Sequence, residues 1–145
     1  MSISNVKSAL YTDLSTLTTT NGYSTTIKKI YKVKKMPNEI NASELPALCL
    51  FLANAPQKPF DEASKTSDLI YFIMIYTSSN SDTDDSGDVE QALYQIYEDI
   101  ITLFNKQTTT TYKLDEVRGI EVLDFFPEVK DINGWAVVPL RIEYK

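Results

Sequence analysis

Apolar residues recur at the spacing of an amphipathic helix in two parts of the chain. In the first part they are three or four residues apart, at Ile3, Val6, Leu10, Leu14 and Leu17. The second part has the same kind of spacing, at Val89, Leu93, Ile96, Ile100 and Leu103. Each set falls on one face of a helix, so we expect two helices. The second helix should have Asp88 as its N-cap, with Gln91 at the capping-box position, and should end near Asn105.

Five other segments are rich in β-branched and aromatic residues, which is typical of strands. They cover residues 27–36, 44–53, 68–77, 120–130 and 135–145. The Asn133-Gly134 pair between the last two segments is a strong hairpin signal. Pro46 stands near the start of the second segment, where a missing N–H is tolerated. Pro139, inside the last segment, indicates an edge strand or a bulge.

These elements predict one α+β domain that spans residues 1–145, in the order α-β-β-β-α-β-β. We expect a mixed or antiparallel sheet of about four to five strands, with the two main helices packed on one face.

Segments 44–53 and 68–77 are apolar at both odd and even positions. This pattern indicates strands that are covered on both faces. Two helices usually cover only one face. The long connection over residues 54–67, or a neighbouring copy of the chain, must therefore cover part of the other face, which favours an oligomer.

The charge distribution is uneven. The formal charge is −6 and the pI is near 4.6, which argues against general affinity for nucleic acid. Five of the fourteen Lys and Arg residues nevertheless fall within eight positions, as Lys28, Lys29, Lys32, Lys34 and Lys35. In a strand, alternation places Lys28, Lys32 and Lys34 in a stripe about 20 Å long on one side. Lys29 and Lys35 then lie on the other side.

This lysine group has three interpretations. Edge strands commonly carry lysine, which prevents edge-to-edge aggregation. The group is also a candidate subunit interface, because the rest of the chain carries 20 acidic residues against 9 basic ones. The third interpretation is a lumen that faces DNA, although Tyr31 is the only aromatic residue among the lysines and no ladder for stacking bases is present.

The residue types of most catalytic and metal sites are scarce. The chain has no histidine, which is the commonest general base, and a single cysteine, Cys49. Cys49 lies in an apolar strand, where burial should raise the pKa of its thiol. The four glycines form no phosphate-binding pattern. We therefore predict no catalytic residue, no cofactor and no metal site, and a protein that is not an enzyme.

Two loops are candidates for partner contacts. In the acidic loop over residues 78–88, Asp82 and Asp84 match positions 1 and 3 of an EF-hand, but position 12 is Leu93 where a glutamate is required. We expect a solvated loop, with weak cation binding or a charged partner contact as alternatives. The contact candidates in this loop are Asp82, Asp84 and Asp85. Those in the 54–67 loop are Gln57, Lys58 and Phe60.

No segment indicates export or membrane insertion. The first ten residues contain no apolar stretch of the signal-peptide type. The longest apolar run, over residues 69–76, is far shorter than the roughly 20 residues of a membrane-spanning helix. A single cysteine allows no intrachain disulfide. We expect a protein that is made and kept in a cytoplasm, without membrane contact.

The order and character of the elements are also informative. A short helix and a strand precede "LPALCLFL"; "LIYFIMIY" then leads into the long helix "VEQALYQIYEDIITLF", and "GIEVLDFFPEV" and "GWAVVPLRIEYK" close the chain. Over roughly residues 3–144, this arrangement resembles the tail-terminator (tail-completion) proteins of tailed bacteriophages and related minor tail and neck proteins.

The resemblance implies a structural virion protein that forms a ring, hexameric in that family, on the end of the tail tube. Its partners would be other copies of itself, the tail tube protein and a head-completion or neck protein, with passive contact to DNA in the lumen. It would be located in the tail or neck of the virion and assembled in the host cytoplasm. The ring would stop tube growth and join the tube to the head.

Two features differ from that family's pattern. The first strand is rich in lysine, and Pro139 lies inside the last strand, so a head–tail connector or neck protein is the alternative. In a different class, the chain would be a small cytoplasmic binding module that uses the 54–67 loop. An enzyme is the third class.

Overall fold

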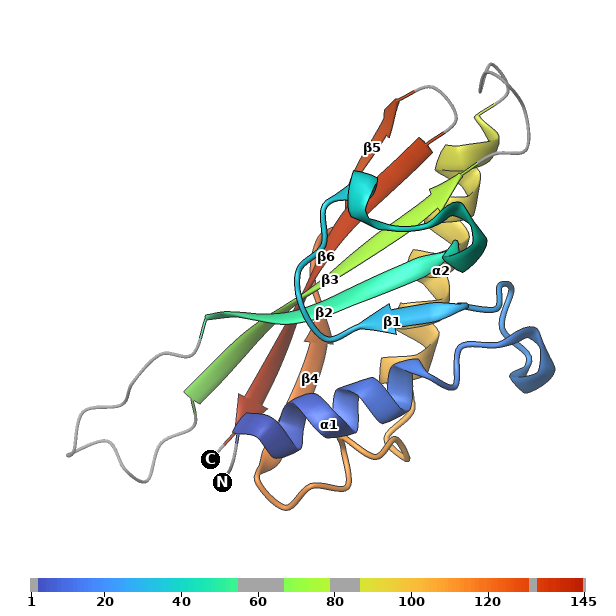
Figure 1. Ribbon diagram of the computed structural model, residues 1–145. Helices are drawn as coiled ribbons and strands as arrows, with labels where there is room; N and C mark the ends of the chain where they lie inside the picture. The colour runs from blue at the N-terminus through green and yellow to red at the C-terminus, as the bar shows by residue number, and fades with distance from the viewer. Residues whose placement is uncertain (1–2, 55–66, 79–86, 131–132, 145) are drawn as a thin grey trace.

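The computed structural model describes residues 3–54, 67–78, 87–130 and 133–144. Within these ranges the chain forms two α-helices and six strands, together with three short 3-10 turns (Figure 1). The elements are α1 (Ile3–Leu14), β1 (Lys29–Tyr31), β2 (Ala47–Asn54), β3 (Ser67–Ser78), α2 (Asp88–Asn105), β4 (Val117–Val122), β5 (Phe126–Lys130) and β6 (Asn133–Tyr144). The predicted α+β class is confirmed, with one strand more than expected.

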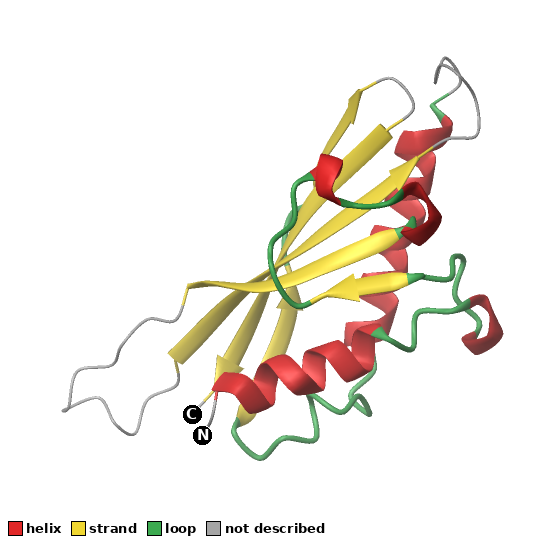
Figure 2. Ribbon diagram, in the orientation of Figure 1, coloured by secondary structure: helices red, strands yellow, loops and turns green. Residues whose placement is uncertain are grey.

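The strands form a single mixed sheet in the order β1-β2-β3-β6-β4, and β5 also pairs with β6 (Figure 2). Only β1 and β2 run parallel; the other pairs are antiparallel. The longest pairing joins β3 to β6 in continuous register from Ser67 opposite Tyr144 to Ser78 opposite Asn133. These two strands form the centre of the sheet.

The core lies between one face of the sheet and the two helices. On β3 this face presents Tyr71, Ile73 and Ile75, which are fully buried because successive strand residues point to opposite faces. Their β6 partners, Leu140, Val138 and Ala136, lie on the same face and are also fully buried. Buried side chains of α1 and α2 join the same cluster, so the expected packing of both helices on one face is confirmed.

The predicted strand over residues 120–130 is in fact two strands, because β6 changes its partner along its length. Its first half pairs with β5, and its second half pairs with β4. Pro139 stands at the change, and its carbonyl oxygen accepts a hydrogen bond from Leu123 N at 2.9 Å. The expectation of an edge strand or a bulge at Pro139 is wrong: β6 is central, and its register with β3 runs through Pro139 without a shift. The proline lies where it needs to donate no N–H.

Several predicted boundaries also shift. Helix α1 ends at Leu14, although Leu17 beyond it is still buried in the core. Asp88 is the first residue of α2 and not its N-cap, because Gly87 occupies that position in a left-handed conformation. The hairpin between β5 and β6 is confirmed, but Asn133 and Gly134 belong to β6.

The predicted lysine-rich strand is the largest local difference. Strand β1 has only three residues, Lys29 to Tyr31, and the chain then bends away from the sheet plane. A continuous stripe of Lys28, Lys32 and Lys34 along one strand is therefore wrong. The strand does lie at the edge of the sheet, with β2 as its only neighbour in the described sheet.

Candidate functional site

The sheet face that points away from the helices carries a second set of apolar side chains. On β2 and β3 these include Phe51 and Phe72, whose rings meet edge to face at 5.7 Å between centroids. Met74, Val137 and Pro139 continue the set, and all five side chains are half-buried. We call this surface the outer face. Its composition confirms that β2 and β3 are apolar on both sides.

The segment after β1 covers part of the outer face. Residues 32–46 leave the sheet edge, cross in front of β2, β3 and β6, and return to begin β2 (Figure 1). The Tyr76 hydroxyl of β3 donates a hydrogen bond to the Lys35 carbonyl oxygen, which ties the segment to a central strand of the sheet. The lysine-rich stretch thus supplies cover that the sequence assigned to the 54–67 loop or to a neighbouring copy. Residues 55–66 of that loop lie outside the described part of the chain.

Most of the lysines lie over aromatic rings. The ammonium groups of Lys29 and Lys35 are 5.5 Å and 5.4 Å from the centre of the Tyr31 ring. Lys34 is 6.0 Å from the Phe51 ring, and Lys32 is 4.3 Å from the ring of Tyr11 in α1. Such contacts hold cations at defined positions while leaving them accessible to solvent.

The predicted lysine group is therefore divided differently from the alternation of a strand. The structure gathers Lys29, Lys34 and Lys35 at Tyr31 and Phe51, and turns Lys32 towards α1. Lys28 is exposed, and its backbone N–H donates to the Pro46 carbonyl oxygen at 2.9 Å.

Two glutamates lie within the same stretch, and both accept internal hydrogen bonds. Glu44 Oε1 accepts from the Tyr31 hydroxyl at 2.7 Å, and this bond raises the pKa of Tyr31 to about 12. Glu39 Oε1 accepts from the Met36 backbone N–H at 2.8 Å. With five lysines and two glutamates, residues 28–46 have a formal charge of +3 in a chain of −6.

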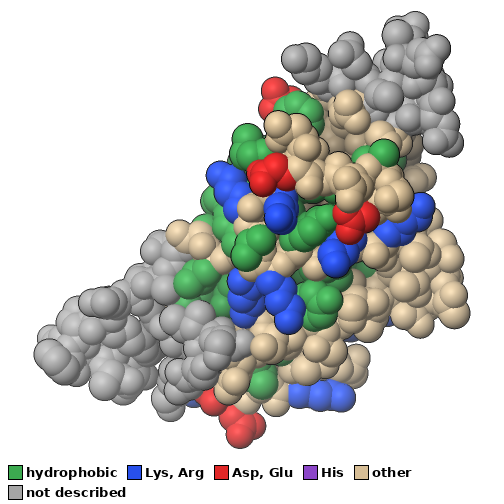
Figure 3. Space-filling view, in the orientation of Figure 1, with side chains coloured by type: hydrophobic (Ala, Val, Ile, Leu, Met, Phe, Trp, Pro, Cys, Tyr) green, Lys and Arg blue, Asp and Glu red, His purple; other side chains and the backbone are tan. Residues whose placement is uncertain are grey.

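Exposed apolar side chains accompany these lysines. Val33 is 56% exposed and Met36 is 54% exposed. Figure 3 shows lysines and apolar side chains mixed on this side of the molecule. We define the basic surface as Lys29, Lys32, Val33, Lys34, Lys35 and Met36. Apolar side chains beside accessible cations are characteristic of an interaction surface.

Cys49 lies beneath this segment and is fully buried in β2. Burial raises the pKa of its thiol, as the sequence predicted. A buried thiol with a raised pKa is a poor nucleophile at neutral pH. Cys49 therefore acts as part of the packing between the sheet and its cover.

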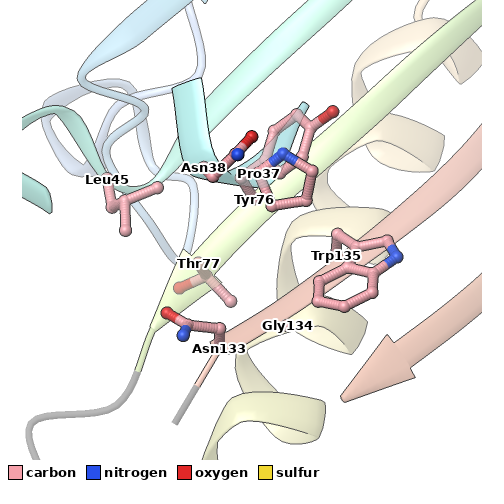
Figure 4. A pocket seen from close by; sticks show the side chains of 8 residues that line it. All are labelled: Pro37, Asn38, Leu45, Tyr76, Thr77, Asn133, Gly134 and Trp135. Carbon is pink, nitrogen blue, oxygen red and sulfur yellow. The ribbon is translucent and has the colours of Figure 1, made fainter. Parts of the chain in front are cut away.

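A pocket of about 320 Å³ opens between this covering segment and the end of the sheet (Figure 4). Tyr76 and Trp135 form its aromatic walls, and Pro37 and Asn38 of the covering segment close one side. The Trp135 Nε1–H donates to Glu128 Oε2 at 3.1 Å. The pocket is large enough for one or two side chains of a partner.

A second charged surface lies on α2, and the sequence analysis did not identify it. Helix α2 contains four carboxylates and no Lys or Arg. Glu90, Tyr94 and Glu98 are spaced four residues apart and so share one exposed face. The Tyr94 ring contacts Phe125 at 5.3 Å between centroids, which places this face towards the β4–β5 connection. The available signal was the i, i+8 spacing of two glutamates on a helix without Lys or Arg.

Strand β5 adds an apolar residue beside this exposed face of α2. Val129 of β5 is opposite Gly134 of β6, which lies against Val89 and Leu93 of α2. Val129 and Tyr94 are each 38% exposed. We define the acidic surface as Glu90, Tyr94, Glu98 and Val129.

The candidate loop contacts cannot be placed on these surfaces. The six residues in question lie outside the described ranges: Gln57, Lys58, Phe60, Asp82, Asp84 and Asp85. Among the described residues, no group of three His, Cys, Asp or Glu side chains could hold a metal ion. Within those ranges, no helix is long and apolar enough to cross a membrane.

No protein-family model matches the chain, and no curated protein matches its sequence. The surfaces described above therefore carry the functional inference.

Proposed function

We propose that this chain is a structural protein of a tailed-bacteriophage virion that forms a ring on the tail tube, as its resemblance to tail terminators implies. The observation that supports this proposal is the outer face. It is a broad apolar sheet surface with a lysine-rich cover whose own Val33 and Met36 remain exposed. Such a surface is suited to protein contacts.

The proposed mechanism is capping. One side of the ring matches the last ring of the tail tube, and the other side offers no position for a further tube subunit. That other side meets a head-completion or neck protein, and DNA passes through the lumen. Binding, and not bond-making chemistry, is the whole activity in this proposal.

The test uses tail tubes assembled from the major tail protein encoded by the same phage. Added protein should appear as a ring on one tube end in negative-stain electron micrographs, and tubes grown in its presence should stay shorter. Bare tube ends and unchanged growth, from a protein that stays monomeric at high concentration, would overturn the proposal.

A head–tail connector or neck protein is the alternative within the same class. It predicts binding to purified heads and not to free tube ends. Incubating the protein separately with heads and with tubes distinguishes the two roles, because a terminator must bind tubes in the absence of heads.

A further inference from the structure

The basic and acidic surfaces lie on opposite sides of the molecule. The basic surface begins at β1, which is one edge of the sheet and where Lys32 lies over Tyr11 of α1, and it continues over the outer face, where Lys34 lies over Phe51. The acidic surface lies on α2, which packs against the other face of the sheet, and on β5, beside the opposite edge. Within one molecule the two surfaces therefore cannot contact each other.

The two surfaces match in composition. Each combines charges of one sign with exposed apolar side chains. Six large hydrophobic side chains are exposed among the described residues, and four of them lie on these two surfaces: Val33, Met36, Tyr94 and Val129. Opposite charges around apolar contacts give an interface both attraction and register.

We propose that the basic surface of one copy binds the acidic surface of the next, in a head-to-tail contact between copies of this chain. This inference rests on the proposed ring function and names the surfaces that build the ring. The occupant of each surface is a second copy because the chain itself supplies the complementary charge. Two different surfaces in contact form a heterologous interface, which produces a ring when the rotation closes.

Charge reversal on each surface tests the pairing. One variant carries Lys32→Glu and Lys34→Glu, and the other carries Glu90→Lys and Glu98→Lys; all four side chains are exposed. Each variant places like charges across the contact, which should raise the protein concentration needed for half-assembly by about tenfold or more. Sedimentation velocity of the full chain, alone and with tail tubes, measures assembly.

Combining the reversals is the decisive step. A chain with all four substitutions should assemble again within about threefold of the wild-type concentration, because each contact regains opposite charges. An equimolar mixture of the two double variants should also assemble, by alternation. The matched control carries Lys113→Glu and Arg118→Glu, two exposed residues outside both surfaces. It changes the net charge by the same amount as the first variant and should assemble like wild type.

Thermal unfolding of each variant establishes that it is folded. Zero-length carbodiimide cross-linking of the wild-type protein tests the same contact without any substitution. In a mixture of ¹⁵N-labelled and unlabelled chains, intermolecular links should join Lys29, Lys32, Lys34 or Lys35 to Glu90 or Glu98.

The outcomes separate the two proposals. If wild type assembles and either double variant assembles equally well, or the four-substitution chain does not recover, this pairing is wrong while the ring function stands. The same holds if every intermolecular link joins other residues. If wild type neither self-associates nor binds tubes, the ring function fails, and the pairing fails with it.

Discussion

The hydroxyl of Tyr76, near the end of the central strand β3, donates a hydrogen bond to the backbone carbonyl oxygen of Lys35 in the segment that crosses the outer face. The bond joins two parts of the chain that are 41 residues apart. Cys49 lies beside this contact on β2 and is fully buried. A side chain of the central strand β3 therefore helps to fix the cover over the outer face.

Replacing Tyr76 by Phe should loosen this cover. Loss of one hydrogen bond at a partly buried position costs about 1 kcal/mol, so local opening should become several-fold more frequent. The measurement is the rate at which a maleimide labels Cys49, the only cysteine. Tyr94→Phe removes a hydroxyl that donates to Glu90 on α2 and should leave the rate unchanged. Equal rates for both variants would contradict a fastening role for Tyr76.

Gly134 lies where α2 packs against β6, and Gly134→Ala should destabilise the fold. A Cβ atom there would be 2.3 Å from Val89 Cγ1 and 3.1 Å from Leu93 Cδ1. Overpacking of this kind costs about 1–3 kcal/mol, which urea denaturation would detect. The control is Gly119→Ala, whose Cβ would meet no atom within 4 Å. Adding Val89→Ala should recover much of the loss, and no recovery would show that a different contact is responsible.

Asp13 fastens the loop that follows α2 to helix α1. Its carboxylate accepts hydrogen bonds from Thr110 N and Thr111 N at 2.8 Å each, and from Thr111 Oγ1 at 2.5 Å. In Asp13→Asn, an NH2 group replaces one acceptor oxygen, which leaves the backbone N–H of Thr110 or Thr111 without its acceptor. We expect a loss of about 2–3 kcal/mol in the free energy of unfolding. Asp124→Asn, at an exposed position, should change stability little; equal losses would contradict this account.

Stability should fall at alkaline pH because Tyr71 is buried. Burial raises its pKa to about 12, from 10.0 in the unfolded chain. Between these values the folded state retains a proton that the unfolded state has lost, so the free energy of unfolding decreases as pH rises. The contribution is complete below pH 10 and is lost by about pH 12, a total of about 2–3 kcal/mol.

Urea unfolding at intervals from pH 8 to 11.5 measures this effect. Tyr71→Phe removes the titrating group, so its stability should decline less over that range than that of the wild type. Part of the decline should remain, because burial also raises the pKa values of Tyr76 and Cys49. Parallel profiles for the two proteins would show that Tyr71 does not contribute.

Periodicity in the sequence was sufficient for the helices and the central strands. Leu10 and Leu14 repeat at helical spacing, which predicts a helix buried along one side. The run from Leu69 to Tyr76 is apolar at every position, which predicts a strand covered on both faces. The raised pKa of Cys49 was likewise predictable from its apolar neighbours. These features depend on residues close together in the chain.

The division of the segment over residues 120–130 into β4 and β5 was not predictable in this way. It depends on Pro139, a residue of another strand, which has no N–H to donate where β6 changes partners. A break imposed by a pairing partner leaves little trace in the local pattern. The same reason explains why Pro139 suggested an edge that does not exist.

The lysine-rich segment shows most clearly which features the sequence alone determined and which only the tertiary structure decided. By itself, the sequence determined that five lysines stand together and that the second face of the sheet needs a cover, and it offered an edge strand as one of three interpretations of the lysines. Only the tertiary structure decided that the lysines and the cover are the same segment. Tyr31, Phe51 and Tyr76 hold it there through contacts across three strands, and residues so distant in sequence are brought together only by folding.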